Sequence, residues 1–385
     1  MNHIQIKQVS DCCGCGACFQ KCPKKCITMC YDKEGFLYPH VDESKCTECG
    51  LCISTCHLLK AEYNPNDSKV MSCYGGYSKS DDIIESSSGG VFWLLTQQIL
   101  KVGGIIYGAV VEGFNVYHSR GTNLEECARF RKSKYLQSDT KETYKEAQTD
   151  LKAGRTVLYS GTPCQIAGLY SFLGKSYDNL ITCEVICHGV PSKLAFDKWL
   201  DELAIKHNGN KPVSVVWRDK SKGWSPVRLT YFFEDGSKWT SVQEENLFQR
   251  GFVNYLYLRP SCYSCKYARL PRVADITLAD FWRNSTDLKV SNENKGINIV
   301  ILSSEKACKL FETIKNEMVY EMDNIKHIVD SCPHVSKKPF YNPKRKSFFK
   351  LLRNHSFEKA IHKTLDPSFC SRIKNYIVRI IKLMF

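Results

Sequence analysis

Near its start the chain reads Cys12-Cys-Gly-Cys-Gly-Ala-Cys-Phe-Gln-Lys-Cys-Pro23, and 34 residues later the same cysteine spacing returns in Cys46-Thr-Glu-Cys-Gly-Leu-Cys-Ile-Ser-Thr-Cys56. Both stretches follow the pattern C-x2-C-x2-C-x3-C. Three cysteines within seven residues wrap one corner of an iron–sulfur cubane, whereas a zinc site needs two separated pairs. The repeat therefore predicts two 4Fe-4S clusters.

The fourth cysteine of each run is expected to bind the cluster of the other run, as in two-cluster bacterial ferredoxins. The first predicted set is Cys12, Cys15, Cys18 and Cys56, and the second is Cys46, Cys49, Cys52 and Cys22. Cys13 lies outside the spacing, and we interpret it as a neighbour that is not a ligand. Cys26 and Cys30 fall in a hairpin predicted over residues 26–38 and are expected to be packing residues. We expect residues 1–65 to form this ferredoxin domain.

Length and composition constrain the rest of the chain. Its 385 residues exceed one typical domain. It contains no run of about 18 apolar residues that could span a bilayer, and the polar residues 1–8 lack the apolar core of a secretion signal. We therefore expect a cytoplasmic protein. In a reducing compartment its 21 cysteines point to metal binding rather than to disulfides.

From about residue 70 the sequence alternates between strands and helices, which predicts an α/β domain with its functional loops at the strand ends. The expected strands cover residues 104–111, 156–159, 180–186 and 297–302, with a hairpin over 227–241, and the expected helices cover 91–100, 166–173, 194–203 and 305–316. We divide this region into an N-terminal part, residues 70–180, and a C-terminal part, residues 181–340. The predicted fold class is thus an α+β ferredoxin domain followed by an α/β flavin and iron–sulfur domain.

Three loops of this second region carry cysteine. Cys164 and Cys187 each follow a predicted strand, and Cys262 and Cys265 form a CxxC pair. Four thiolates suffice for a third cubane. The spacing also allows a different reading, in which Cys164 is a single reactive or buried cysteine and the CxxC pair is a dithiol.

A serine- and glycine-rich turn, Glu85-Ser-Ser-Ser-Gly-Gly90, precedes the predicted helix over residues 91–100. A turn of this kind at a helix N-terminus presents free amides to a phosphate group, although a serine there can also simply cap the helix. The segment Arg131-Lys-Ser-Lys-Tyr135 is a second polar, basic patch that suits phosphate or ribose, or else a solvated surface. The usual dinucleotide fingerprint G-x-G-x-x-G does not follow any predicted strand.

With these motifs in view, the chain resembles the beta-subunit family of coenzyme F420 hydrogenases and dehydrogenases over about residues 1–340. The segments that carry the resemblance are Ser87–Gly90, Tyr107–Ala109, Ser133–Tyr135, Gly161–Gly168, Cys187–Ser192, Arg218–Lys220, Gly223–Trp224 and Ala274–Trp282. The resemblance implies FAD and a 4Fe-4S cluster that pass electrons between iron–sulfur partners and a substrate.

The resemblance also implies site residues. It favours the third cluster on Cys164, Cys187, Cys262 and Cys265, with Cys183 as an alternative to Cys187. The implied FAD contacts are Ser88, Gly89, Gly90, Ser133, Lys134, Tyr135 and Gln137. His188, beside Cys187, is a weak candidate for acid–base catalysis, and no other catalytic residue is assigned.

The leading functional hypothesis is therefore an oxidoreductase that passes electrons between 4Fe-4S clusters and FAD to reduce or oxidise a small organic substrate. Its expected partner is a redox protein or a ferredoxin-like donor. The alternative is an electron-transfer subunit that serves a partner enzyme and has no substrate of its own. The sequence leaves open which substrate is used, whether a deazaflavin coenzyme takes part, the direction of electron flow and the oligomeric state.

Toward the C-terminal end the composition changes again and becomes strongly basic. Residues 337–385 hold thirteen Lys and Arg against two Asp and Glu, within a formal net charge of +14 for the whole chain. We interpret residues 341–385 as a basic tail with an amphipathic helix over 373–385. Such a helix either lies on an anionic membrane surface, giving peripheral membrane association, or docks on the protein itself. A nucleic-acid role is not expected, because the tail lacks interleaved aromatic residues in a groove-like fold.

Overall fold

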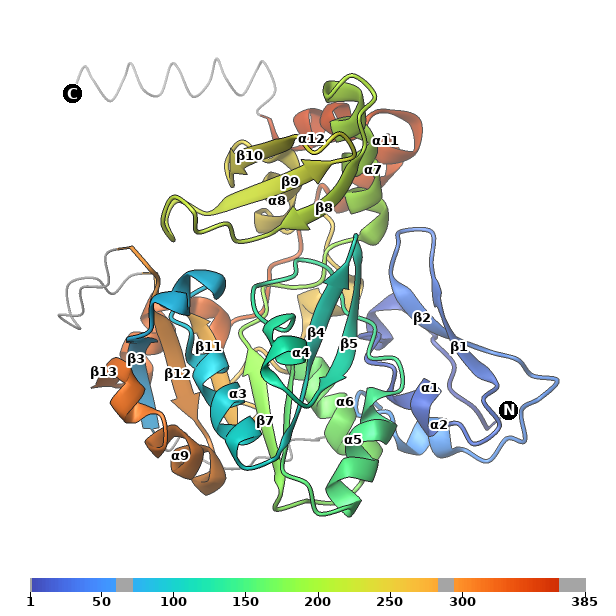
Figure 1. The fold of residues 1–385 in the computed structure, drawn as a ribbon. Helices are drawn as coiled ribbons and strands as arrows, with labels where there is room; N and C mark the ends of the chain where they lie inside the picture. The colour runs from blue at the N-terminus through green and yellow to red at the C-terminus, as the bar shows by residue number, and fades with distance from the viewer. Residues whose placement is uncertain (1, 60–71, 283–293, 367–385) are drawn as a thin grey trace, which may run out of the picture.

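The computed structural model describes residues 2–59, 72–282 and 294–366. The predicted amphipathic helix over residues 373–385 therefore lies outside the described residues. The chain forms an N-terminal cysteine-rich unit, a large mixed sheet with helices on both faces, and a smaller lobe above the sheet (Figure 1). Among the described residues, no helix is long and apolar enough to cross a membrane.

The N-terminal unit is built around one hairpin and two short helices. Strands β1 (Ile27–Tyr31) and β2 (Leu37–Val41) pair antiparallel across the turn at Asp32, whose carboxylate accepts hydrogen bonds from two backbone amides of the turn. Helices α1 (Ala17–Lys21) and α2 (Leu51–Ser54) each begin after a glycine with positive φ, Gly16 and Gly50. The two cysteine runs thus occupy equivalent loop–helix positions.

The large sheet has the strand order β13-β3-β12-β11-β7-β6-β4-β5. These strands span Met318–Asp323 (β13), Ser72–Ser78 (β3), Asn298–Leu302 (β12), Ile276–Asp280 (β11), Leu180–Val185 (β7), Val157–Gly161 (β6), Ile105–Glu112 (β4) and Asn115–Gly121 (β5). The central strands β4, β6, β7 and β11 are parallel, and the outer pairings are antiparallel. Loops that follow the parallel strands therefore meet at one edge, where a site is expected in an α/β fold.

Helices cover both faces of this sheet. The helices α3 (Val91–Lys101), α4 (Leu124–Ala128) and α9 (Glu305–Glu312) pack on one face, and α5 (Thr143–Lys152) and α6 (Pro163–Leu173) pack on the other. Helix α10 (Ile325–Ser331) follows β13 at the edge. Separate apolar clusters result beside α3 and α9, beside α5 and α6, and beside α10, and α6 also contacts α1 of the N-terminal unit.

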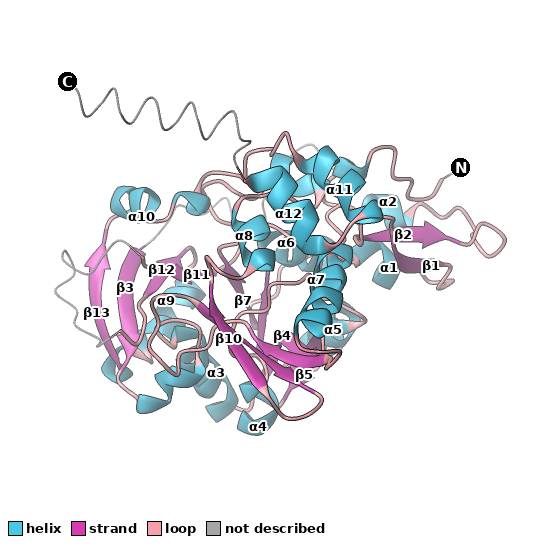
Figure 2. Ribbon diagram, turned by 90° about the horizontal axis from the view of Figure 1, so that it is seen from above, coloured by secondary structure: helices cyan, strands magenta, loops and turns pink. Residues whose placement is uncertain are grey.

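The smaller lobe is a three-stranded sheet wrapped by helices, as Figure 2 shows from above. Its strands are β8 (Pro212–Val216), β9 (Arg228–Phe233) and β10 (Lys238–Val242), and its helices are α7 (Lys193–Lys206), α8 (Leu247–Val253), α11 (Arg345–Asn354) and α12 (Phe357–Leu365). Helices α11 and α12 bury apolar side chains such as Phe348 and Ile361 in this lobe. The described part of the expected tail is thus packed structure.

Most expected elements lie within a few residues of the observed ones, but two differences are informative. The helix expected over 305–316 ends at Glu312, and a short 3-10 turn (Lys315–Glu317) leads into β13. Five strands, β3, β5, β8, β11 and β13, are not predicted as strands by the sequence pattern. In β3 the glycines Gly75 and Gly76 interrupt the apolar pattern, and a Cβ at Gly76 would lie only 2.8 Å from the Tyr320 side chain and the Val319 carbonyl oxygen of β13.

Candidate iron–sulfur and cofactor site

The first predicted ferredoxin set comes together in the structure. Burial, together with the nearby Cys12 and Cys56 thiols, raises the pKa of Cys18 well above its ordinary value. Cys15 is half-buried, and burial with the charges of Cys18 and Cys12 raises its pKa against a hydrogen bond with Cys13 that lowers it. Burial and the charge of Cys12 likewise raise the pKa of Cys56. Thiols that repel one another's charge are stabilised as thiolates by a shared cation. The donor set therefore fits a cluster.

The second predicted set lines a small cavity of the N-terminal unit. Its wall includes Cys22, Cys46, Cys49 and Cys52, so the cysteine that crosses over from the first run does reach the second run. Backbone amides approach these sulfurs, with the Ile4 amide 3.2 Å from Cys52 Sγ. Amide donors of this kind stabilise cluster-bound sulfur.

Cys26 is buried in the apolar cluster of the N-terminal unit, as expected of a packing residue, and it also lines the same cavity. Its Sγ lies 3.3 Å from Cys22 Sγ. Burial acts to raise the pKa of Cys22, but the backbone amides of Cys26, Lys24 and Lys25 and the Cys26 thiol hold it below the ordinary value. Burial and the Cys22 sulfur raise the pKa of Cys26 to about 12. Cys22 is thus the more readily ionised thiol of the pair.

The four cysteines of the predicted third set also converge. Cys164 lies in the first turn of α6, where Thr162 and Gln165 form a capping box, and Cys187 follows β7. Cys262 and Cys265 belong to the short 3-10 turn Pro260–Ser264 and the residue after it. Burial raises the pKa of Cys262, and the charges of Cys187, Cys164 and Cys265 raise it further.

Backbone pairing brings these loops together. Pro191 and Leu258 form an antiparallel bridge, and the Arg259 amide donates to the Val190 carbonyl at 2.8 Å. The Val190 amide lies 3.4 Å from Cys262 Sγ. The loop after β7 and the CxxC loop are therefore neighbours, although about 70 residues separate them in the sequence.

The structure also distinguishes between Cys187 and Cys183 as members of the third set. Cys183 is buried within β7 among the apolar side chains that pack against α3. Burial and the neighbouring carboxylates Glu184 and Asp275 raise its pKa, with no contribution from the other three cysteines of the set. By contrast, burial raises the pKa of Cys187, and the charges of Cys164 and Cys265 raise it further. The geometry thus favours Cys187 in the third set.

Cys13 lies between the first ferredoxin set and the third set. The ligand atoms of Cys13, Cys15 and His57 lie within 4.8 Å of one another, and Cys13 also interacts with Cys164. His57 Nε2 is 3.6 Å from Cys13 Sγ, and its other ring nitrogen bonds to the hydroxyl of Tyr267. The two thiol sets are therefore adjacent across the contact between the N-terminal unit and the large domain.

Arg259 holds this contact together. Its fully buried guanidinium donates to the carbonyls of Cys12 at 2.8 Å and Leu37 at 2.7 Å, and to Gln137 Oε1 at 3.1 Å. Gln137 Nε2 donates in turn to the Cys13 carbonyl. Both ends of this amide, expected as an FAD contact, are thus engaged with protein groups. The sequence pattern carries no signal for Arg259, because its partners are carbonyls on a distant loop.

A buried ion pair lies behind the third set. Arg272 donates to Glu184 Oε1 at 2.5 Å and to the carbonyls of Tyr267 and Val335, while Thr277 donates to the same carboxylate oxygen. Burial raises the pKa of Glu184, against the opposing effect of Arg272. Arg272 also acts electrostatically on Cys187 and Cys265. It therefore adds positive charge beside the set.

His188 is half-buried and packs among other rings. Its ring stacks on Tyr255 at 4.6 Å and meets the His334 ring edge-on at 4.9 Å. Its Nε2 lies 3.3 Å from the Phe252 carbonyl. Burial, together with His334, lowers the pKa of His188 to about 4. A neutral, packed imidazole suits a structural role.

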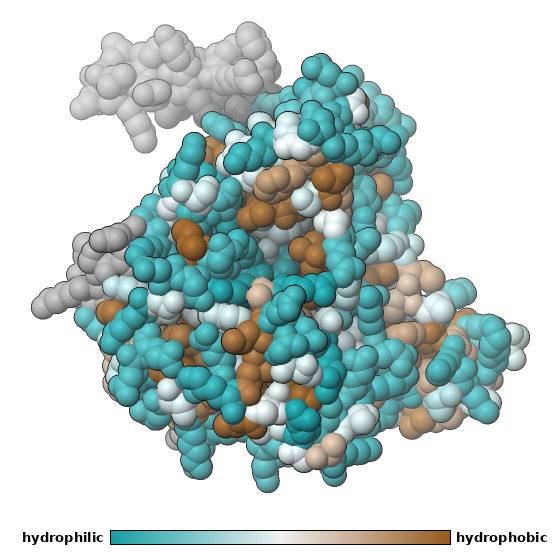
Figure 3. Space-filling view, in the orientation of Figure 1, coloured by the Kyte–Doolittle hydropathy of each residue, from teal (hydrophilic) through white to brown (hydrophobic). Residues whose placement is uncertain are grey.

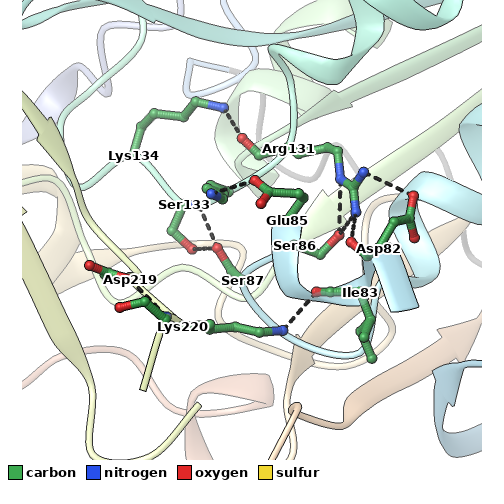
Figure 4. A network of polar contacts seen from close by, with 12 residues as sticks. Asp82, Ile83, Glu85, Ser86, Ser87, Arg131, Ser133, Lys134, Asp219 and Lys220 are labelled. Carbon is green, nitrogen blue, oxygen red and sulfur yellow. Dashed lines mark hydrogen bonds and ion pairs between the residues drawn. The ribbon is translucent and has the colours of Figure 1, made fainter. Parts of the chain in front are cut away.

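The serine- and glycine-rich turn forms the centre of a second polar site, shown in Figure 4. Ser87 Oγ accepts the Ser133 amide at 2.6 Å, and Ser88 Oγ donates to the Ile297 carbonyl at 2.7 Å. A Cβ on Gly89 would lie 2.6 Å from the Gly76 carbonyl oxygen, so this close approach to β3 requires glycine. Helix α3 begins directly after Gly90, with its N-terminus at this turn.

Basic side chains surround the turn. Arg131 bonds to Asp82 and Ser86 and stacks on Trp93, and Lys134 donates to the Arg129 and Arg131 carbonyls. Lys220 is buried and donates to the carbonyls of Ile83, Ser88 and Lys295 at 2.8, 3.0 and 2.5 Å. Burial, together with neighbouring cations, lowers the pKa values of Lys134 and Lys220 to about 7.

Aromatic residues lie next to this turn. Arg218 donates to Asp280 at 2.9 Å and to the Ser87 carbonyl at 3.3 Å, with the Tyr135 hydroxyl at 3.5 Å. Trp224 and Trp282 stack at 4.2 Å, and the Arg218 guanidinium lies 5.0 Å from the Trp282 ring. Figure 3 shows a hollow with apolar side chains between the small lobe and the large sheet. A phosphate-type turn and flat rings fit a nucleotide-like cofactor.

The grouped cysteines suit a redox protein of the iron–sulfur class. Residues 154–328 match a family model that describes the C-terminal region of the beta subunit of coenzyme F420 hydrogenase/dehydrogenase. This region is therefore similar to that beta-subunit family, which comprises oxidoreductase subunits.

One solved relative is a chain of the F420-reducing NiFe hydrogenase complex from Methanosarcina barkeri, with a TM-score of 0.45 and 16% sequence identity. That likeness covers 79% of the present chain and 94% of the other chain. No curated protein matches the sequence.

Proposed function

We propose that this protein is an iron–sulfur flavoprotein oxidoreductase that exchanges electrons with a redox partner and reduces or oxidises a small organic molecule. The carrying observation is the convergence of Cys164, Cys187, Cys262 and Cys265 beside the first ferredoxin set. Three adjacent thiol sets are an arrangement for electron transfer, whereas structural zinc needs no such chain of sites.

The two ferredoxin sets would hold one 4Fe-4S cluster each, and the four converging cysteines a third. FAD would lie over the turn Ser87–Gly90, where Ser88, Gly89, Gly90, Ser133, Lys134 and Tyr135 are the proposed contacts. Clusters carry single electrons and a flavin carries one or two, so the combination couples one-electron donors to two-electron chemistry.

The chain's own residues have separate tasks in this proposal. Arg259 and Gln137 fix the N-terminal unit against the large domain, so that the first and third thiol sets stay adjacent. Arg272 supplies positive charge near Cys187 and Cys265, which favours the more negative reduced state. Lys220 holds the Ser–Gly turn through the Ser88 carbonyl.

Chemical analysis of the anaerobically purified full chain tests the proposal. We expect about twelve iron and twelve acid-labile sulfide per chain, with one FAD. About eight iron and eight sulfide per chain without flavin would mean that only the two N-terminal sets bind clusters. That result would indicate an electron-carrying protein instead. Substrate screening with reduced protein would follow the first result.

A further inference from the structure

Cys26 is a fifth thiol in the cavity of the second ferredoxin set. The spacing of the cysteine runs leaves it without a role. In the structure it is 5% exposed and lines the wall together with Cys22, Cys46, Cys49 and Cys52. A second, independent observation is its contact with a proposed ligand, because Cys26 Sγ lies 3.3 Å from Cys22 Sγ.

This contact is a hydrogen bond between two sulfurs. The distance is far longer than the roughly 2.05 Å of a disulfide bond, so the sulfurs are not joined covalently. One thiol group is therefore the hydrogen-bond donor, and the sulfur of the other is the acceptor. A sulfur this close to a ligand sulfur can reach the same iron after a small side-chain movement, since χ1 of a cysteine has alternative staggered positions.

The hairpin fixes the backbone around Cys26. Cys26 directly precedes β1, and its carbonyl accepts the Asp42 amide at 2.7 Å, which closes the hairpin. The neighbouring cysteine of the same hairpin offers a matched comparison. Cys30 is exposed, lies 3.6 Å from Thr28 Oγ1 and is not part of the cavity wall. The position of Cys26 in the cavity is thus a property of that residue and not of the hairpin as a whole.

We propose that Cys26 is a reserve ligand for the cluster of the second set and takes the place of Cys22 when Cys22 is lost or modified. This inference rests on the proposed cluster in that cavity. In the exchange, the iron bond to the residue-22 side chain is broken or never forms. An iron bond to Cys26 sulfur forms instead, and the Cys26 thiol proton passes to solvent. No electron is transferred in the exchange.

The test is the iron and sulfide content of full-length variants purified without oxygen. Cys22→Ala should keep the wild-type content, because alanine cannot bind iron and Cys26 replaces the lost thiol. The double variant Cys22→Ala/Cys26→Ala should lose about four iron and four sulfide per chain. Equal loss in the single and double variants would overturn the proposal, as would full retention in both.

Three controls make the comparison specific. Cys22→Ala/Cys30→Ala should behave like Cys22→Ala, because Cys30 lies outside the cavity. Cys49→Ala should lose about four iron although Cys26 is present, because Cys26 contacts the Cys22 sulfur. Cys26→Ala alone should keep all iron. If it loses iron instead, Cys26 is an ordinary ligand or a folding requirement, and the reserve role is wrong.

Electron paramagnetic resonance gives a readout that folding does not mimic. In Cys22→Ala the reduced signal of one ferredoxin cluster should persist with altered g values, because a differently placed thiolate binds it. Unchanged g values would contradict the exchange. A wild-type content of about eight iron would count against the third cluster only, and the difference between the single and double variants would still decide the role of Cys26.

Discussion

The two ferredoxin sets and the third set present the same chemistry, four thiols in a small volume, but they are assembled in opposite ways. The ferredoxin cysteines all lie between Cys12 and Cys56, and each run supplies three neighbours from one loop and helix. The third set draws on residues as far apart as Cys164 and Cys265, and needs β6, β7 and the CxxC turn to be in place.

Because of this difference, the third set should depend on the folding of the large domain more strongly than the ferredoxin sets do. A local site needs only its loop to close, so its geometry depends little on distant packing. A site assembled from three segments is formed only when the whole large sheet is formed. We therefore expect perturbations of the core to affect the third set more than the ferredoxin sets.

The largest expected effect comes from the third set itself. Cys187→Ala should remove about four iron per chain and leave the ferredoxin clusters, as judged by iron analysis and resonance spectra. Cys183→Ala is the matched control, because it removes a buried thiol from the adjacent strand without touching the set. Iron loss in Cys183→Ala but not in Cys187→Ala would reverse the assignment.

The next effect concerns the buried ion pair behind the third set. Arg272→Met leaves the Glu184 carboxylate buried without its cation, and breaking such a pair costs about 3–5 kcal/mol. Chemical denaturation should show this loss, and the third-set iron should fall before that of the ferredoxin sets. The double variant Glu184→Gln/Arg272→Met should recover part of the stability. No recovery would show that Arg272 acts mainly through its carbonyl partners.

A smaller effect is expected at the contact between the two regions. Arg259→Met leaves the buried carbonyls of Cys12 and Leu37 without a donor, at about 1–3 kcal/mol for each carbonyl. Limited proteolysis should then release the N-terminal unit, while each region keeps its iron. Arg155→Met removes an exposed arginine that bonds to the Gly103 carbonyl and serves as the control. If both variants resist the protease equally, Arg259 does not hold the N-terminal unit against the large domain.

The smallest effect concerns the Ser–Gly turn and pH. Lys220 has a pKa of about 7, lowered by burial, and a bound diphosphate would favour its charged form. Binding then takes up a proton, so affinity should be highest below about pH 7 and fall as pH rises above it, by about tenfold per unit of pKa shift. Binding of pyrophosphate and of FAD to flavin-free protein, measured between pH 6 and 9, tests this.

Two variants separate the lysine from the general effect of pH. Lys220→Met should flatten the profile, although Lys134 contributes a similar pKa. The exposed Lys222, in the same loop, should leave the profile unchanged when replaced by methionine. A flat profile in the wild type would mean that neither buried lysine faces the bound anion.

The hairpin, the cysteine runs and the main strand–helix units were predictable because their signals are local. Spacing places Cys12, Cys15 and Cys18 on one loop whatever the rest of the chain does. Hydrophobic runs likewise predicted β4, β6, β7 and β12 to within a few residues. The family segments further pointed to the Ser–Gly turn and to Cys164 and Cys187 as parts of a site.

The sequence by itself determined the residue types that could form each thiol set. Only the tertiary structure decided which thiols meet: Cys187 rather than Cys183, Cys13 between two sets, and Cys26 beside Cys22. The physical reason is that a side chain's neighbours depend on strand order and side-chain direction, which set spatial distance independently of sequence distance. Arg259 and Arg272 were invisible to the sequence pattern for the same reason, because their partners are mainly backbone carbonyls and buried groups brought close by the folded sheet.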